Sequence, residues 1–379
     1  MPLKQILKTV GYWRLITLII AIVAIPIINV RRDFSMVDNS FNPWHVLNMW
    51  ANFDGLHYYD LSIYGYGVPT HTDKSYAFFP VYPFIIRTVN NLVKNHLISG
   101  LLVSHIAFVL ALFFLFKLLK LDFKAKTVKL TIFVLLLFPT SFFFGSYYTE
   151  SIFLLLSVLV FYLARKGEFF LSALFALIAS ATRITGVFLW PALIIEYYLY
   201  HGSNIKKSLN PSAIWLVLPP LGLISYIKYQ FQKTGDALYF INSQPAFGAS
   251  RVVDKVILIH QVFFRYAKML IFVDHTSTLF FAVLLEFLAG ALFLGLILYG
   301  LNKLRLSYIV YTALSFFLPT FTGTFSSMPR YVLVLFPLFA LLATLLEKAP
   351  RVVFKSYLAV SAILAAITIA LFTRGYFIG

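Results

Sequence analysis

Long apolar runs, separated by short polar segments, follow one another along almost the whole chain. Most runs approach the length of about 20 residues that an α-helix needs to cross the hydrocarbon core of a bilayer. The pattern predicts about eleven spans, which in chain order are 15–30, 97–119, 128–145, 149–164, 168–182, 186–200, 212–231, 278–300, 307–323, 331–346 and 356–372. We therefore expect an all-α, polytopic membrane protein whose residues 1–379 form a single transmembrane domain.

Some of these runs leave more than one interpretation open. Several are shorter than about 18 residues and could be shortened or re-entrant segments. The first run has the basic flank of a signal peptide, but Arg31 and Arg32 follow it directly and no small-residue cleavage site is visible, so we interpret it as an uncleaved span. Two mixed aromatic stretches, 78–93 and 256–272, are interpreted either as extra spans or as helices lying in the membrane interface.

Composition and charge agree with a membrane protein. Hydrophobic residues make up 60% of the chain and charged residues 12%, whereas a soluble protein has about 25% charged residues. The net charge of +17 would suggest nucleic-acid binding in a soluble protein, but here the basic residues flank apolar runs. We interpret them as topogenic charge in contact with anionic membrane lipids, and nucleic acid is not an expected partner. Because the chain has no cysteine, disulfides, zinc thiolates and cysteine nucleophiles are excluded.

The distribution of charge also predicts an orientation. With a cytoplasmic N-terminus and alternating spans, the inner side carries 17 basic and 4 acidic residues, a net of +13, and the outer side carries 14 basic and 10 acidic residues, a net of +4. The positive-inside rule favours this arrangement, which places the C-terminus outside. The two long connections, 31–96 and 232–277, then lie outside. Since long ordered loops usually carry function, we expect a catalytic first outer loop and a functional second one.

Two carboxylates are candidates for acid–base chemistry. Asp54 lies among aromatic residues in the first long loop, and partly dry surroundings would raise its pKa, as suits a general base. An Asp followed by Gly is equally typical of a turn or a helix cap. Glu150 opens an apolar run, where it is either a helix N-terminal carboxylate favoured by the dipole or a functional group close to hydrocarbon.

Two arginines lie at the predicted outer ends of spans. Arg183 lies between two apolar runs with almost no loop, and Arg330 lies at the start of another run. A lone arginine in such a place could snorkel to a lipid phosphate. Two arginines facing a polar cavity would instead bind a phosphate or diphosphate. Glu286 is the best candidate for a carboxylate deep in an apolar run.

Several common catalytic motifs are absent from the sequence. The chain has no P-loop, which argues against direct use of ATP, and no DxD motif, the usual metal clamp for nucleotide sugars. It has no HExxH motif, and its eight histidines are scattered without the spacing of a metal site. No metal ligand is therefore assigned from the sequence.

Five sequence motifs are spread along most of the chain. They are Trp50…Phe53-Asp54-Gly55…His57-Tyr58…Gly65-Tyr66, Ala77-Phe78-Phe79-Pro80-Val81-Tyr82-Pro83, Pro139-Thr140-Ser141…Tyr148-Thr149-Glu150-Ser151, Ala181-Thr182-Arg183…Gly186 and Pro329-Arg330-Tyr331. In combination they resemble the motifs of PIG-V-type mannosyltransferases, relatives of the enzyme that adds the second mannose to GPI anchors, in the GT-C superfamily. The resemblance covers about residues 45–345 and is specific in the combination of its motifs rather than in any one of them.

The resemblance implies a GT-C fold of about eleven transmembrane helices whose long extracytoplasmic loops carry short interfacial helices. It implies transfer of a sugar, by inversion, from a polyprenyl-phosphate carrier to a glycan, glycolipid or protein acceptor. Asp54 would be the general base, and Glu150 would orient the acceptor or share that role. Arg183 and Arg330 would hold the donor phosphate. The remaining residues expected to contact the substrates are His57, Tyr58, Tyr82 and Tyr148.

The resemblance implies no cofactor besides the lipid-linked donor and leaves a divalent metal open. It implies the plasma membrane for a prokaryotic source or the endoplasmic reticulum for a eukaryotic one, and the sugar and acceptor need not be those of the GPI pathway. Two other hypotheses remain. A transporter or flippase of lipid-linked sugars would use ionisable groups near mid-membrane, for which Glu286 is the best candidate. A non-catalytic membrane scaffold would tolerate substitution of the outer polar residues.

Overall fold

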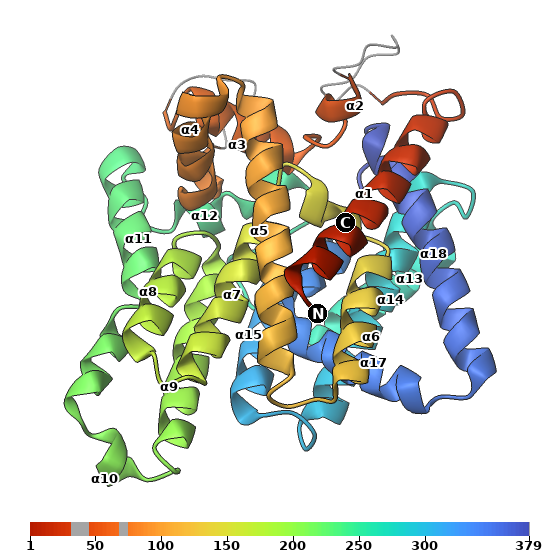
Figure 1. The fold of residues 1–379 in the computed structure, drawn as a ribbon. Coiled ribbons are helices and arrows are strands. Elements are labelled where there is room, and N and C mark those ends of the chain that lie inside the picture. Colours follow the sequence, from red (N-terminus) through yellow and green to blue (C-terminus); the bar gives the residue numbers. More distant parts are fainter. Residues whose placement is uncertain (32–44, 68–74, 379) are drawn as a thin grey trace.

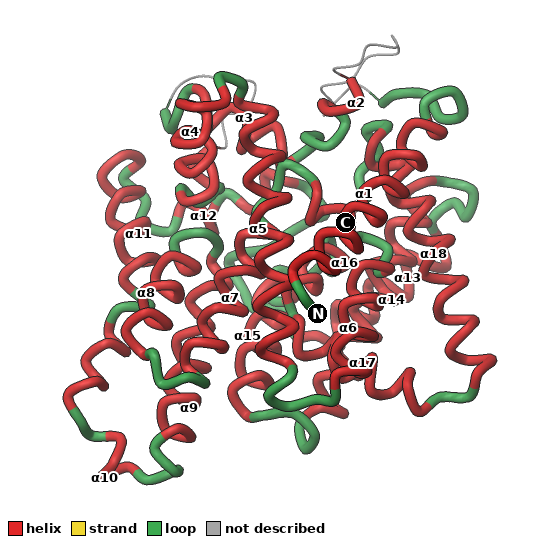
Figure 2. The backbone as a smooth tube through the Cα atoms, viewed as in Figure 1, coloured by secondary structure: helices red, strands yellow, loops and turns green. Residues whose placement is uncertain are grey.

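The protein is helical in all of the regular structure that the computed structural model describes, which covers residues 1–31, 45–67 and 75–378 (Figures 1 and 2). No strand occurs among these residues. The α-helices are α1 Leu3–Ala24, α2 His45–Asn48, α3 Asp54–Ile63, α4 Val81–Val93, α5 His96–Leu119, α6 Ala125–Leu137, α7 Glu150–Ala164, α8 Phe169–Ser180, α9 Leu189–Tyr200, α10 Ile205–Ser208, α11 Leu221–Thr234, α12 Tyr239–Asn242, α13 Ile259–Phe272, α14 Thr278–Gly300, α15 Leu306–Thr320, α16 Met328–Tyr331, α17 Phe336–Lys348 and α18 Arg351–Thr373. Short 3₁₀ segments are η1 Ser75–Ala77, η2 Ser141–Gly145, η3 Ile184–Phe188, η4 Pro211–Val217, η5 Gln244–Phe247 and η6 Val332–Val334.

Two of the long helices, α5 and α14, begin at polar caps and consist mostly of apolar residues. The side chain of Asn95 accepts a hydrogen bond from the amide of Ile98 at the start of α5. The Ser277 side chain does the same for the amide of Phe280 at the start of α14. These caps satisfy amide groups that have no partner inside the helix, which fixes where each helix begins.

Fewer described helices qualify as candidate spans than the sequence pattern predicts. Five described helical segments are long and apolar enough to cross a membrane, or six if a bent pair of helices counts as one span. The five segments are Leu3–Ala24, His96–Leu119, Pro211–Thr234, Thr278–Gly300 and Arg351–Thr373. Four further apolar helices, Glu150–Ala164, Phe169–Ser180, Ile184–Tyr200 and Leu306–Thr320, are shorter. The predicted count of eleven is therefore not confirmed.

Breaks in the backbone explain part of the difference. The predicted span 128–145 stops at Leu137, because Phe138 is extended before Pro139, and the chain resumes as the 3₁₀ segment η2. The predicted span 331–346 is divided into Met328–Val334 and Phe336–Lys348, which meet at 90°. A continuous apolar pattern does not reveal such breaks, since both halves of each run remain buried.

The two mixed aromatic stretches form α4 and α13, of 13 and 14 residues, and neither qualifies as a span. In α4, Tyr82 and Ile86 are fully buried, whereas Phe84 is 70% exposed. The long segments 31–96 and 232–277 thus contain short helices in their described parts, as expected. Residues 32–44 and 68–74 of the first segment lie outside the described residues.

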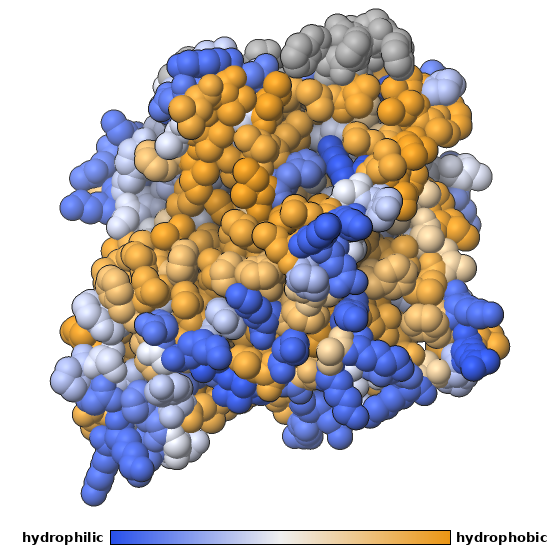
Figure 3. Space-filling model, in the orientation of Figure 1, coloured by the Kyte–Doolittle hydropathy of each residue, from blue (hydrophilic) through white to orange (hydrophobic). Residues whose placement is uncertain are grey.

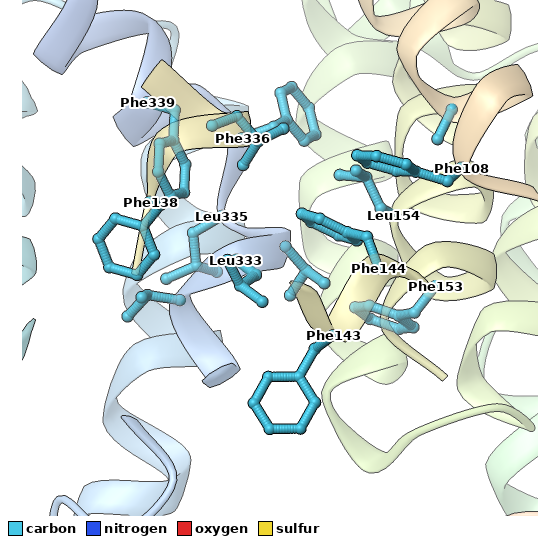
Figure 4. Packing of buried hydrophobic residues seen from close by; sticks show 14 of the residues in the cluster. Phe108, Phe138, Phe143, Phe144, Phe153, Leu154, Leu333, Leu335, Phe336 and Phe339 are labelled. Carbon is cyan, nitrogen blue, oxygen red and sulfur yellow. The ribbon is translucent and has the colours of Figure 1, made fainter. Parts of the chain in front are cut away.

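The core joins helices from both halves of the chain through aromatic and leucine side chains (Figure 4). Phe144 from η2 stacks on Phe108 of α5, with ring centroids 4.4 Å apart. Phe138 contacts Phe339 of α17 edge to face at 5.3 Å. Because lipid tails are as apolar as these side chains, close packing rather than removal from water stabilises this contact inside a bilayer.

The face seen in Figure 3 carries a broad apolar belt, with hydrophilic residues gathered below it. The lower end of the view carries a dense group of hydrophilic residues, and α10, which contains Lys206 and Lys207, lies there. The helices α3 and α4 lie at the opposite end (Figure 1). The belt and the apolar helices identify an integral membrane protein.

Candidate active site

A cavity of about 1000 Å³ brings together residues from distant parts of the chain. It is lined by α3, the start of α7, the α8–η3 junction, the 240–251 segment and the helices α13 to α16. The sequence-predicted residues that line it are Asp54, His57, Tyr58, Tyr148, Glu150, Arg183 and Arg330.

Tyr82 is the predicted residue that the cavity does not include. Its side chain is fully buried, and its hydroxyl contacts the carbonyl oxygen of Gly100 at 3.2 Å and the Ser104 hydroxyl at 2.8 Å. Tyr82 thus ties α4 to α5, and a contact between its hydroxyl and a substrate is not part of our proposal below.

Asp54 is the first residue of α3 and follows a strained residue. Phe53 has φ 55° and ψ −118°, a conformation that bulky residues rarely adopt and that often marks functional sites. The preceding Asn52 is fully buried; its amide nitrogen donates to the carbonyl of Phe372 at 2.8 Å, and its own carbonyl accepts from the Tyr148 hydroxyl at 2.7 Å. These bonds hold the backbone that presents Asp54 to the cavity.

Two carboxylates and two arginines form one line of alternating charge, which we call the ionic chain. Arg330 Nη1 lies 2.7 Å from Asp54 Oδ2, and Arg330 Nε lies 3.6 Å from Glu150 Oε1. The same Glu150 oxygen accepts from Arg183 Nη1 at 2.9 Å. The ionic chain therefore runs Asp54–Arg330–Glu150–Arg183, and its formal charges cancel.

The members of the ionic chain differ in exposure. The Glu150 side chain is 1% exposed and that of Arg330 is 7% exposed, whereas the side chains of Arg183 and Asp54 are 14% and 27% exposed. Both arginines thus face the cavity as members of ion pairs. Glu150 Oε2 is buried and has no hydrogen-bond partner in the part of the chain that the structure describes.

The pKa of Asp54 differs from the expectation drawn from its aromatic neighbours. Burial does raise this pKa, but the positive charges of Arg330 and His57, the hydrogen bond from Arg330 and the charge of Arg251 together outweigh burial. The pKa of Asp54 therefore lies below its ordinary value of 3.8, and the expected rise is wrong. Asp54 is ionised at neutral pH, as a proton acceptor must be.

Aromatic rings surround the two arginines. The ring of Tyr331 lies 5.5 Å from the Arg183 guanidinium and 5.2 Å from that of Arg330. The Tyr148 ring lies 5.2 Å from Arg330. Such contacts favour a cation and restrict its orientation. Tyr331 was not assigned a role from the sequence, although it belongs to the Pro329-Arg330-Tyr331 motif.

A second group of aromatic side chains forms the cavity wall next to Asp54. His57 stacks on Phe78 with ring centroids 4.4 Å apart, and Phe247 contacts both rings edge to face at 5.8 Å. Tyr58 meets Phe78 edge to face at 5.1 Å. Flat apolar surfaces of this kind pack against the C–H faces of sugar rings.

Further polar residues line the cavity and had no role assigned in it from the sequence, among them Arg251, Tyr266 and Glu286. No ion pair joins Arg251 to a carboxylate in residues 1–31, 45–67 and 75–378; its guanidinium lies 3.5 Å from the carbonyl oxygen of Phe247. Arg251 lies in the segment 232–277. The only sequence feature that pointed to it was the general expectation that this long loop carries function. Within the described ranges, no group of three or more side chains is arranged to hold a metal ion.

The arrangement of the helices is similar to that in the crystal structure of ArnT from Cupriavidus metallidurans bound to undecaprenyl phosphate, with a TM-score of 0.52 and 12% sequence identity. The similarity covers 97% of this chain and 76% of that chain, and at this identity it shows the fold alone. No protein-family model matches the chain, and no curated protein matches its sequence. The expected helical fold thus has a solved counterpart in ArnT, and the PIG-V type is not confirmed.

Proposed function

We propose that the chain is a glycosyltransferase that moves a sugar from a polyprenyl-phosphate carrier to a glycan, lipid or protein acceptor. The observation that carries this proposal is the ionic chain, which places a carboxylate and two arginines at one cavity in a GT-C fold. ArnT, which shares the fold, was solved with undecaprenyl phosphate bound. Mannose is the sugar that the motif resemblance favours.

In the proposed reaction Asp54 accepts the proton of the acceptor hydroxyl. The acceptor oxygen then forms a bond to the anomeric carbon of the donor sugar from the face opposite the phosphate. The bond between this carbon and the phosphate oxygen breaks, and polyprenyl phosphate leaves with the electron pair. Configuration inverts because bond formation and bond breaking occur on opposite faces. The cationic groups at the cavity stabilise the negative charge that develops on the leaving phosphate.

The arginines of the ionic chain are already paired, so a phosphate must compete with Asp54 and Glu150 for them. Arg251 lines the same cavity without a carboxylate partner in the described residues, and Asp54 lies within reach of its charge. We propose that Arg251 gives the phosphate its first cationic contact and that Arg330 and Arg183 then share it. This sequence of contacts would release Asp54 from Arg330 at the point where a base is needed.

Glu150 is proposed to orient the acceptor. Its Oε1 holds both arginines, whereas its buried Oε2 has no hydrogen-bond partner in the described part of the chain. Buried carboxylate oxygens are almost always hydrogen-bonded, so an acceptor hydroxyl in the cavity is a fitting donor. His57, Tyr58 and Tyr148 would then supply the wall along which the sugars lie.

The orientation that we propose places the N-terminus in the cytoplasm and the cavity on the extracytoplasmic side. The dense group of hydrophilic residues at the end of the molecule where α10 carries Lys206 and Lys207, and the position of α3 at the other end, support it (Figures 1 and 3). A donor and an acceptor would then meet outside the cytoplasm, at the plasma membrane or in the endoplasmic reticulum according to the source.

The test is sugar transfer by the purified protein in lipid vesicles, with polyprenyl-phosphate-mannose and a panel of glycan acceptors. Asp54→Asn should lower the rate by about 10²–10⁴-fold, because the base is lost while the shape of the side chain is kept. Asp60→Asn is the matched control, since Asp60 lies on the same helix and does not line the cavity. Thermal melting checks that each variant is folded.

Equal activity of wild type and Asp54→Asn would remove Asp54 from the mechanism and leave Glu150 as the candidate base.

The position of Glu286 inside a candidate span and at the cavity is the one observation that favours transport of a lipid-linked sugar. A flipping assay in which Glu286→Gln abolishes movement of the lipid and Asp54→Asn does not would replace the transferase by a transporter.

A further inference from the structure

The residues just before Arg330 form a tightly bonded loop, Thr324 to Ser327, which we call the 324–327 loop. Ser327 has φ 66° and ψ 8°, the left-handed conformation that favours glycine and is costly for a residue with a Cβ atom. Its carbonyl accepts hydrogen bonds from the amides of Arg330 at 3.1 Å and Tyr331 at 2.9 Å. The conformation of Ser327 therefore sets the direction in which Arg330 leaves the backbone.

Glu286 and Tyr266 hold this loop from two other helices. Glu286 Oε1 accepts a hydrogen bond from the Ser327 amide at 3.2 Å, and Glu286 Oε2 accepts one from the Tyr266 hydroxyl at 2.5 Å. The same hydroxyl accepts from the amide of Phe325 at 3.1 Å and lies 3.0 Å from the Thr324 hydroxyl. Two backbone amides of the loop thus depend on one carboxylate and one phenol.

These hydrogen bonds are buried, so water cannot easily replace them. Glu286 is 6% exposed and Tyr266 is 1% exposed, so little water is available to take over a broken bond. The ring of Phe325 would lie 3.1 Å from a Cβ added at Gly290 of α14, which shows how closely the loop approaches the helix. A buried amide without a partner would favour another conformation of the loop, in which Ser327 leaves its strained state.

We propose that Glu286 is a positioning residue that keeps Ser327 in its left-handed conformation and thereby aims Arg330 at Asp54. The part of this inference that concerns catalysis rests on the proposed function, because it requires Arg330 to serve the transfer reaction. The part that concerns the 324–327 loop does not, and it is tested separately. In this role Glu286 only accepts hydrogen bonds, and it neither gives up nor takes up a proton.

The first experiment compares Glu286→Gln with Glu286→Ala in the transfer assay. A glutamine oxygen can still accept from the Ser327 amide, so Glu286→Gln should retain most of the wild-type kcat. Glu286→Ala should lose about tenfold or more, because two buried hydrogen bonds are lost and the loop relaxes. The loss should appear mainly in kcat, since Glu286 acts through Arg330 rather than on a substrate.

Ser327→Gly supplies a rescue that a general packing defect would not show. Glycine adopts the left-handed conformation without strain, so the loop no longer needs Glu286 to stay there. The cost of Glu286→Ala should therefore be several-fold smaller in the Ser327→Gly background than in the wild-type background. Because the comparison is between two costs, any effect of Ser327→Gly alone cancels.

The second experiment requires no activity. The chain contains no cysteine, so Ser326→Cys carries the only thiol. Residue 326 is 8% exposed and lines the cavity, and its modification by a small thiol reagent reports how often the loop opens. Modification should be slow in Ser326→Cys alone and with Glu286→Gln, and about tenfold faster with Glu286→Ala.

The outcomes separate the two proposals. A wild-type protein that transfers no sugar from any donor, combined with fast thiol modification in Glu286→Ala only, would end the proposed function and support the role of Glu286 in the loop. Equal modification rates in all three proteins would overturn the inference about Glu286 even if transfer occurs. An equal loss of activity in Glu286→Gln and Glu286→Ala would also overturn it, because that pattern requires the charge or the proton of Glu286.

Discussion

Asp54 and Glu150 carry the same charge at the same cavity, but their surroundings give them different duties. Glu150 is almost fully buried and is the carboxylate that balances Arg183 while also approaching Arg330. Asp54 is about a quarter exposed and pairs with Arg330 alone among the described residues. The more exposed carboxylate is the one that can exchange its partner for a substrate, and the buried one is the better structural anchor.

This difference predicts an order of stability among two conservative variants. Glu150→Gln should lower the melting temperature more than Asp54→Asn, because breaking a buried ion pair costs about 3–5 kcal/mol and Glu150→Gln leaves Arg183 without its carboxylate. In Asp54→Asn, Arg330 still has Glu150 nearby. Thermal unfolding in detergent measures both. A larger drop for Asp54→Asn would show that Asp54, and not Glu150, anchors the ionic chain.

The lowered pKa of Asp54 predicts a pH profile. Because the pKa in the folded state lies below its unfolded value, the Asp54–Arg330 pair stabilises the protein at neutral pH, and this contribution is lost as pH falls through the folded pKa. The base also stays ionised, so kcat/KM of the wild type should show no loss through Asp54 between about pH 5 and pH 8.

Arg330→Gln removes the largest influence that opposes burial, so the pKa of Asp54 should rise and the acidic limb of the kcat/KM profile should move upward. The matched control is Arg87→Gln, since Arg87 donates to backbone carbonyls of residues 61–63 and does not line the cavity. An acidic limb at the same pH in wild type and Arg330→Gln would mean that another group is the base.

At the scale of single residues, the sequence indicated which side chains could carry chemistry better than which of them contact one another. Asp54 and Arg330 are 276 positions apart, and no local pattern shows that they meet. The prediction of a raised pKa for Asp54 failed for that reason, because the cation that lowers it is contributed by a distant helix. Arg251 was missed for a related reason, since nothing in its neighbourhood of the sequence separates it from an ordinary loop arginine.

At the scale of elements, the positions of helices were largely predictable, and their interruptions only in part. The apolar run 128–145 contains Pro139, and the helix stops before it, as proline requires. The bend of 90° before Phe336 has no equally clear signal. Pro337 lies in the first turn of α17, where proline is common, and it does not by itself indicate the direction of the preceding segment. The break between α16 and α17 leaves Arg330 at the cavity. A continuous straight helix would not place polar backbone and Arg330 there.

Close packing between elements predicts the effect of a single methyl group. A Cβ added to Gly186 in η3 would lie 2.1 Å from the carbonyl oxygen of Ala179 at the end of α8, so the backbone must move. Arg183 lies just before η3, and its carbonyl accepts from the Gly186 amide at 2.9 Å. Gly186→Ala should therefore lower both the melting temperature and the transfer rate, by disturbing the pair between Arg183 and Glu150.

Gly295→Ala provides the matched control for this prediction. Gly295 lies within α14, and a Cβ added there meets nothing within 4 Å. Since alanine is a better helix former than glycine, Gly295→Ala should keep its activity and gain slightly in stability. Similar losses in both variants would mean that the close approach of η3 to α8 does not matter for the site.

At the scale of the whole molecule, composition alone predicted the environment. The excess of apolar residues cannot be buried in a soluble core of this size, and the structure shows it as a belt on the surface (Figure 3). The predicted number of eleven spans is not confirmed, because an apolar run of 12 to 15 residues has the same composition whether it crosses a membrane fully or partly. The shared fold with ArnT also could not have been found from the 12% of identical residues.

The proposed orientation predicts which positions a membrane-impermeant thiol reagent reaches. Lys206→Cys, in α10 at the hydrophilic end, should react only when the cytoplasmic side is accessible, and Lys94→Cys, between α4 and α5, only from outside. Both positions are exposed, and the native chain contributes no thiol background. Intact cells or oriented vesicles provide the two conditions. The reverse labelling pattern would show the opposite orientation in the membrane, with the cavity on the cytoplasmic side.

The ionic chain also has a consequence for the order of events. While the cavity is empty, Asp54 is occupied by Arg330, so neither water nor an acceptor finds an available base. A phosphate that draws Arg330 away makes Asp54 available in the same step. Kinetics would then be sequential and ordered, with the lipid-linked donor entering first. The resting protein would in this way be protected from activating an acceptor, or a water molecule, before there is anything to transfer.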